Sequence, residues 1–396
     1  MYGSSWYPHD GFKFVPLFVT GFPAYRHSNR DLETTDMRTR PSARAKKQVY
    51  RHPELWLLTS IGIMFGTVAS AEAQMASPLQ SGHYSPTMMN VRDMAYPPAG
   101  LFVLWYSAFT SSNSFVDRNG NKFESINLSE INPALPDINV DLRLKALASV
   151  PTVFWASNFR ILGGARYMVG IAPNFVSADV SIFTERAGIG NPDTSIVRQI
   201  DSKNSGFSDF FVAPVGLSWG WEHYDFTAMY SFYPPTGKYE TGNAESIGLG
   251  FWTHQVQGRG YYYPRPDKAT AVMVGLIYEM NGKIKDVDVS PGDRFTLEWG
   301  VSQYFSDRFE VAVQGGHNWQ VSDDTGNDVY WDPTYHDRKS TVAGGITLWP
   351  WKGHLAVTAK YAFDFGVRQR FKNSTLFVNL LFVPNWLTGA PANAAR

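Results

Sequence analysis

From Gly100 onward, apolar and polar residues alternate along the chain in segments of about ten residues. In HLAVTAKYAFDF, residues 354–365, the apolar side chains of Leu355, Val357 and Tyr361 alternate with those of Thr358 and Lys360. The stretches RFTLEWGVSQY, RFEVAVQ, VDLRLKALA and TLFVNLLFVP show the same period. A period of two places alternate side chains on opposite faces of a β-strand. The sequence therefore predicts an all-β chain.

A soluble β-sandwich also alternates, but three features favour a transmembrane barrel. The segments approach the length of about 9 to 11 residues that a tilted membrane strand needs, whereas soluble strands average about five or six. Charged residues make up 18% of the chain, below the roughly 25% typical of soluble domains. Aromatic residues gather at the strand ends, as in interfacial girdles, at Trp219, Trp221, Trp349, Trp351 and Trp386.

The connections indicate how the strands cross the membrane, since outer-membrane barrels alternate short periplasmic turns with longer outer loops. Every second connection is short, and 258–267 breaks this alternation. We therefore predict an antiparallel up-and-down barrel of about twelve strands with both ends in the periplasm. The strands are expected near residues 100–111, 138–157, 163–183, 208–219, 223–233, 245–257, 268–280, 293–304, 309–320, 337–349, 354–365 and 373–384.

One apolar run, Leu55 to Gln74, follows the basic residues Lys46, Lys47 and Arg51 and ends in small residues. This pattern predicts a signal peptide over 51–73, with a single membrane anchor as the alternative. Residues 1–50 lack periodicity and are interpreted as an upstream extension that is not native to the protein. The barrel is expected over 100–384, followed by a tail at 385–396.

Residues 74–99 show no strand pattern, and we expect this segment to lie in the lumen rather than in the periplasm. The chain has no cysteine, which excludes disulfides and thiolate metal sites. It carries 35 basic and 35 acidic residues, so a nucleic-acid partner has no electrostatic support.

A family resemblance rests on motifs spread over residues 80–384. They are Pro214 with Leu217-Ser218-Trp219, Pro235-Thr236-Gly237-Lys238-Tyr239, Gly248 with Trp252, Tyr278-Glu279 with Asn281-Gly282, Pro291-Gly292-Asp293 and Asp323-Asp324-Thr325-Gly326. With these motifs the chain resembles the phenol meta-pathway degradation family. The resemblance implies an outer-membrane β-barrel that is encoded near genes for the breakdown of aromatic compounds and admits such substrates. It supplies no catalytic residues.

Ser218 lies in Gly216-Leu217-Ser218-Trp219-Gly220, which spells the G-x-S-x-G nucleophile elbow. That elbow requires a turn from a strand to a helix, whereas here two predicted strands flank a tight turn. We interpret the motif as a β-turn and expect no catalytic residue. An outer-membrane esterase or phospholipase remains an alternative.

Metal and cofactor sites are not expected. The stretch SDDTGND, residues 322–328, does not match the spacing of a calcium loop and is interpreted as a polar turn. The histidines show no metal-ligand spacing with acidic neighbours. Among them, His254 and His354 are the best candidates for lining a pore.

The polar faces of the strands supply the candidate site, because the face away from lipid lines the lumen of a barrel. Charges of mixed sign there form an internal ion-pair network or border a narrow water-filled path. The predicted lumen-lining residues are Asp141, Arg143, Lys145, Tyr233, Met273, Glu279, Glu298, Glu310, Lys360 and Asp364.

These observations predict a monomeric channel of the bacterial outer membrane for small hydrophobic or aromatic compounds. Its partners are outer-membrane lipid and these solutes, and it uses no cofactor. The two alternatives are the enzyme named above and a structural or adhesive barrel that acts through its long outer loops.

Overall fold

The computed structural model describes residues 82–127, 129, 136–188, 191–240, 246–329 and 331–384. The predictions for residues 1–50, 51–73 and 385–396 lie outside these ranges. No helix among the described residues is long and apolar enough to cross a bilayer.

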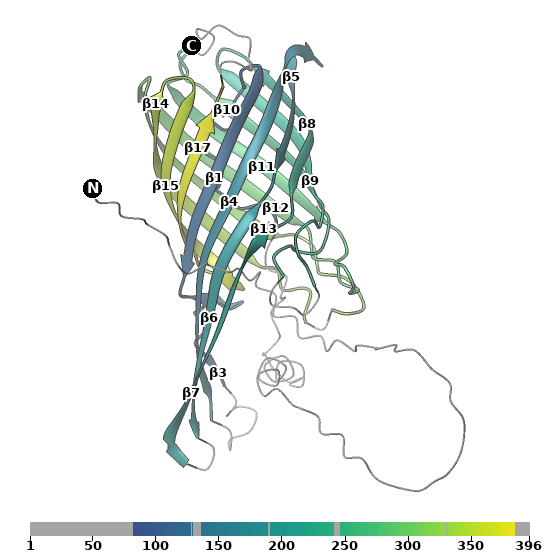
Figure 1. Cartoon of the computed structure of the whole chain (residues 1–396), viewed down its shortest axis with the longest axis vertical. Helices are drawn as coiled ribbons and strands as arrows, with labels where there is room; N and C mark the ends of the chain where they lie inside the picture. The colour runs from purple at the N-terminus through teal and green to yellow at the C-terminus, as the bar shows by residue number, and fades with distance from the viewer. Residues whose placement is uncertain are drawn as a thin grey trace, which may run out of the picture.

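Twelve antiparallel strands form a closed barrel, which confirms the predicted fold (Figure 1). The barrel closes because β1 pairs with β17 on one side and with β4 on the other, so that Trp105 lies opposite both Leu380 and Pro151. The strands are β1 (Gly100–Ser112), β4 (Ile138–Ile161), β5 (Ala165–Ala172), β8 (Phe211–Gly220), β9 (Tyr224–Tyr233), β10 (Thr253–Tyr262), β11 (Thr270–Asn281), β12 (Arg294–Ser306), β13 (Phe309–Gln320), β14 (Arg338–Trp351), β15 (Leu355–Arg368) and β17 (Ser374–Phe382).

The two rims of the barrel differ in their connections. One rim carries the short turns 162–164, 221–223, 263–269, 307–308 and 352–354, together with the start of β1 and the end of β17. The longer loops gather at the other rim, at the lower end of Figure 1. This arrangement matches the alternation of periplasmic turns and outer loops in outer-membrane barrels.

A hairpin extends the wall beyond the long-loop rim. The strands β6 (Phe175–Gly188) and β7 (Asn191–Phe207) continue β5 and β8, and β6 pairs with the first half of β4 (Figure 1). The sequence predicted one strand over 163–183 and a loop over 184–207, whereas the structure has β5 followed by this hairpin, whose first strand buries Ala178 and Val180. Short strands accompany it: β3 (Ser125–Ile126) pairs with β4, and β2 (Phe115–Val116) pairs with β16 (Arg370–Phe371).

The outward face of the barrel is apolar. On β15, Tyr361, Phe363 and Phe365 are 55%, 51% and 43% exposed, as expected of side chains that face lipid. Large aromatic residues flank this band at the short-turn rim, where Trp221, Phe305 and Trp351 are exposed. The predicted girdle is therefore present at this rim.

One predicted strand is misplaced. The sequence suggested 245–257, whereas β10 spans Thr253–Tyr262. The alternating residues before it, Ile247 and Phe251, are buried in the long loop, where Phe251 packs in a cluster with Ile284 and Trp331. Because β10 lies further toward the C-terminus than predicted, the turn to β11 is 263–269. This connection no longer breaks the alternation of short and long connections, as the predicted one at 258–267 did.

Candidate functional site

Residues 82–99 run inside the barrel and contact strands on several sides of it. The Thr227 hydroxyl on β9 donates to the Met94 carbonyl at 2.8 Å, and Asn379 Nδ2 on β17 donates to the Met88 carbonyl at 3.0 Å. Arg166 on β5 donates to the Pro97 carbonyl at 2.9 Å. This inserted segment, Gly82 to Ala99, therefore crosses the interior between opposite walls.

Seven of the predicted lumen residues are buried on the inward face of the wall. They are Tyr233, Met273, Glu279, Glu298, Glu310, Lys360 and Asp364. Their burial follows from the strand period, because the residues between them carry the lipid-facing side chains.

Glu298 on β12 is the main anchor of the inserted segment. Its carboxylate accepts from the Tyr84 hydroxyl at 2.8 Å and from the Thr87 backbone N–H at 2.6 Å. It also pairs with Arg259 on β10, and both side chains are at most 2% exposed. Gly275 of β11 lies opposite both residues in the sheet register. Because glycine lacks a side chain, the ion pair can form across the intervening strand.

Two further wall charges hold the segment. Glu310 on β13 accepts from Arg92 at 2.6 Å, and the same guanidinium donates to the carbonyls of Lys268 and Ala269 in the 263–269 turn. Lys360 on β15 donates to the Met89 carbonyl at 2.9 Å. The mixed charges of the lumen are thus engaged by the segment, and they do not line an open path at these positions.

A second ion-pair cluster lies near the long-loop rim. Arg294 on β12 is 1% exposed and donates to Asp337 at 2.8 Å, and Arg370 donates to the same carboxylate at 3.1 Å. Lys339 lies 3.7 Å from Asp364, which also accepts from Thr341. Asp364 is therefore separated from the Glu298 group, with which the sequence grouped it.

Three predicted lumen residues are placed differently. Asp141, Arg143 and Lys145 are on the face of β4 opposite Leu144, and Leu144 lines the interior. Asp141 and Arg143 form an exposed ion pair at 2.8 Å. The sequence misjudged the face because β1 ends opposite Leu144, so Asp141 and Arg143 lie beyond the end of β1 and Lys145 lies next to that end. Outward side chains there meet water rather than lipid, so the polar side chains of β4 point outward and the apolar ones point inward.

The structure also contradicts the prediction that His254 and His354 line a pore. His254 is exposed on the outer face of the barrel, where it stacks with Tyr230 and Trp252. His354 lies in the turn between β14 and β15 and contacts the Val383 carbonyl at 2.9 Å. His83 faces the interior instead, although it precedes the first predicted strand.

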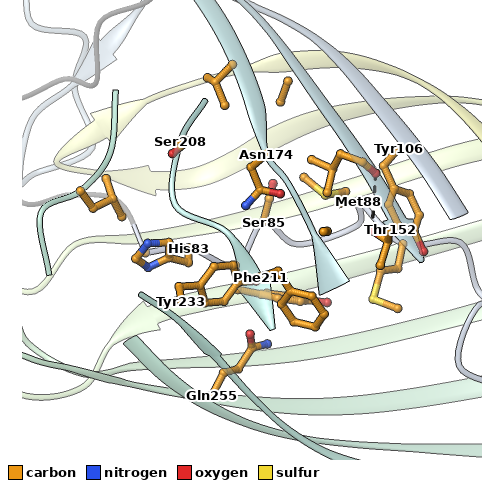
Figure 2. Close-up of a pocket in the computed structure, with 18 of the residues that line it drawn as sticks. His83, Ser85, Met88, Tyr106, Thr152, Asn174, Ser208, Phe211, Tyr233 and Gln255 are labelled. Atoms are coloured by element: carbon orange, nitrogen blue, oxygen red, sulfur yellow. Dashed lines mark hydrogen bonds between the residues drawn. The ribbon is translucent and has the colours of Figure 1, made fainter. Parts of the chain in front are cut away.

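A cavity of about 340 Å³ remains between the inserted segment and one side of the wall. Its lining is largely apolar and includes Phe154, Phe211 and Tyr233 from the wall and Met88, Met89 and Met94 from the segment. Figure 2 shows Phe211 and Tyr233 lying beside His83 above Gln255. His83 stacks on Tyr233 with ring centroids 4.4 Å apart. Such surfaces favour flat apolar molecules.

The inserted segment also carries a buried carboxyl group. Asp93 accepts from the Asn90 backbone N–H at 2.6 Å and from the Tyr106 hydroxyl at 2.9 Å. Burial raises the pKa of Asp93, although these hydrogen bonds and the charge of Lys360 act in the opposite direction.

Ser218 does not have the environment of a nucleophile elbow. It lies on β8 within a hairpin, fully buried, and its hydroxyl lies 2.7 Å from Thr227 Oγ1, which can accept from it. The required turn from a strand to a helix is replaced by the 221–223 turn between β8 and β9.

Acidic side chains of the stretch 322–328 bind other residues of the long loops. Asp324 accepts from the Gly292 backbone N–H and from Trp331 Nε1, each at 2.8 Å, and Asp323 pairs with His336. In the part of the chain that the structure describes, no group of three or more His, Asp or Glu residues is arranged to hold a metal ion.

The chain resembles one protein family in sequence and an outer membrane channel in fold. A family model described as "Putative MetA-pathway of phenol degradation" matches residues 112–380. An outer membrane channel from Pseudomonas putida F1 has a TM-score of 0.55 at 13% identity, and the match covers 75% of this chain and 100% of the channel. The translocator domain of the autotransporter NalP from Neisseria meningitidis has a TM-score of 0.40 at 11% identity, covering 74% and 92%. No curated protein sequence matches.

Proposed function

The chain belongs to the family described as putative MetA-pathway of phenol degradation, and from this premise we propose that it is an outer-membrane channel for small hydrophobic or aromatic compounds. The solute enters the cavity, binds transiently to its aromatic and methionine side chains, and leaves by diffusion. Such passage needs neither a catalytic residue nor a cofactor.

The cavity carries this proposal. It lies inside a closed barrel whose outer face is apolar, and its volume of about 340 Å³ is within the range of small-molecule pockets. Aromatic rings bind other flat rings through offset and edge contacts, and the methionine sulfurs add favourable contacts with ring edges. The fold likeness to an outer membrane channel gives further support.

In this proposal the inserted segment is a movable plug. It fills the charged side of the lumen and supplies one wall of the cavity, so a solute that crosses the barrel has to displace part of it. Many of its anchors are single hydrogen bonds to backbone carbonyls, each of which contributes about 1 kcal/mol from a neutral donor and about 1.5 to 3 kcal/mol from Lys360. Local displacement therefore costs far less than unfolding of the barrel.

Uptake by intact cells tests the proposal, because the lipopolysaccharide leaflet slows the entry of apolar solutes. We expect cells that produce the protein to take up radiolabelled toluene several-fold faster than cells with an empty vector. Cells producing an unrelated twelve-stranded barrel are the control for membrane damage. Equal rates in all three strains would contradict the proposed function.

A disulfide between the plug and the wall tests whether the segment moves. Val91 Cγ2 lies 2.8 Å from the position of a Cβ at Gly300 on β12, close to the separation of about 3 Å between Sγ and the opposite Cβ in a disulfide. The native chain has no cysteine, so Val91→Cys with Gly300→Cys introduces the sole pair. We expect oxidation to reduce uptake to the empty-vector rate and a reductant to restore it.

The two single-cysteine variants control for the substitutions themselves and should not respond to oxidation. Full uptake by the oxidised double variant, with the disulfide confirmed by mass spectrometry, would show that the segment stays in place during transport.

A further inference from the structure

Two glutamines on β10 face the cavity with unused hydrogen-bonding capacity. Gln255 and Gln257 are 0% and 4% exposed, and both line the cavity. The Gln255 amide contacts the Ser231 hydroxyl at 3.4 Å, and Gln257 Nε2 contacts the Met229 sulfur at 3.5 Å. Among the described residues, Gln255 Nε2 and Gln257 Oε1 have no partner. Whichever way each amide is turned, one of its two polar atoms is left over.

Buried amide atoms without a hydrogen-bond partner lower the stability of the folded protein. A buried polar atom without a partner destabilises a protein by about 1 to 3 kcal/mol, so most are paired. A leucine at either position would fill similar space without this cost. The wall thus presents a donor and an acceptor two residues apart on one strand, both directed at the same cavity. In Figure 2 the Gln255 amide points toward the rings of Phe211 and Tyr233.

The cavity also lacks the charges found elsewhere in the lumen. No Asp, Glu, Lys or Arg is among its described lining residues, although Arg259, Glu298 and Lys360 are buried in the same barrel. The inserted segment lies between these charges and the cavity and satisfies them with Tyr84, Thr87 and Met89. The imidazole of His83 is held between Thr253 and Asp209. A charged solute would therefore lose its hydration here without gaining an ionic partner.

We propose that the cavity is a binding site for a neutral, flat apolar molecule bearing one group that both donates and accepts a hydrogen bond, such as a hydroxyl group, and that Gln255 and Gln257 recognise this group. The rings and methionines bind the apolar body, and the two amides pair with the polar group. This inference rests on the proposed function and adds a selection rule to it: neutral over charged, and hydroxylated over purely apolar.

Competition binding to the protein in lipid nanodiscs tests the rule, with benzyl alcohol, toluene, benzyl methyl ether and benzoate as probes and empty nanodiscs as the blank. The ether accepts a hydrogen bond but cannot donate one. We expect benzyl alcohol to bind the native protein about tenfold more tightly than the ether, the effect of one buried hydrogen bond. Benzoate should not compete.

The variant Gln255→Leu with Gln257→Leu should change the ratio of the benzyl alcohol and toluene dissociation constants about tenfold in favour of toluene. Gln199→Leu, a matched substitution on the exposed hairpin, should leave this ratio unchanged. The comparison of alcohol and ether uses native protein and so does not depend on folding of the variant.

The outcomes separate the two proposals. Binding of toluene and benzyl alcohol with no preference over the ether, and with an unchanged ratio in the double variant, would overturn the selection rule while leaving the proposed function intact. Failure of every aromatic probe to bind would overturn both. Tight binding of benzoate would overturn the selection for neutral molecules.

Discussion

Removal of residues 82–99 is expected to raise the ion conductance of the barrel several-fold. The segment occupies the charged half of the lumen and contacts β9, β12, β13, β15 and β17 through hydrogen bonds. Without it, water reaches Arg259, Glu298 and Lys360, which are at most 2% exposed in the intact chain. Hydrated charges of both signs support an ion current with little selectivity between cations and anions.

Single-channel recording in planar bilayers measures this change. A chain that begins at Gly82 serves as the matched control, because it keeps the whole described segment and should conduct like the longer chain. The truncated barrel that begins at Gly100 should show larger current steps at the same salt concentration. Equal steps for the two chains would show that the conducting path does not pass through the space filled by the segment.

The substitution Glu298→Ala is expected to reduce the free energy of unfolding by about 3 to 5 kcal/mol. It removes the partner of Arg259 and leaves a guanidinium that is 1% exposed without its ionic contact. It also removes the acceptor for Tyr84 and Thr87, so the inserted segment loses an anchor in the same step. Unfolding by urea in phospholipid vesicles, followed by tryptophan fluorescence, measures the loss.

A double variant distinguishes the cost of a stranded charge from the value of the ion pair. Replacement of both Arg259 and Glu298 by methionine removes both charges and fills similar volume, so we expect a smaller loss than from Glu298→Ala alone. A loss for Glu298→Ala of less than about 1 kcal/mol would mean that Arg259 finds another partner or water.

Much of the barrel could be predicted from the sequence, because lipid on one side and lumen on the other impose a strict alternation. The apolar set on β15 is a clear case, with Tyr361 and Phe363 outward and Lys360 inward. The rule fails where the environment changes. Around Ile247 the same alternation belongs to a folded loop, and at Arg143, beyond the end of β1, the outward side chain forms an exposed ion pair.

The site was predicted less completely, since half of it comes from a segment without a pattern. The wall charges Glu298 and Lys360 follow from periodicity, but their contacts with Thr87 and Met89 join residues 211 and 271 positions apart. These contacts use backbone atoms of the segment, which every residue type has, so the sequence gives no sign of them. Arg259 was missed for a different reason, because the misplaced β10 put it in a turn.

The use of main-chain carbonyls as anchors has a consequence for how such proteins diversify. Asn379, Lys360 and Thr227 bind oxygens of Met88, Met89 and Met94 that every amino acid possesses. The side chains at these positions are then free to change without detaching the segment. The side chains of Met88, Met89 and Met94 line the cavity. Substitutions in this short stretch can therefore reshape the cavity for a different solute while the barrel and its closure stay as they are.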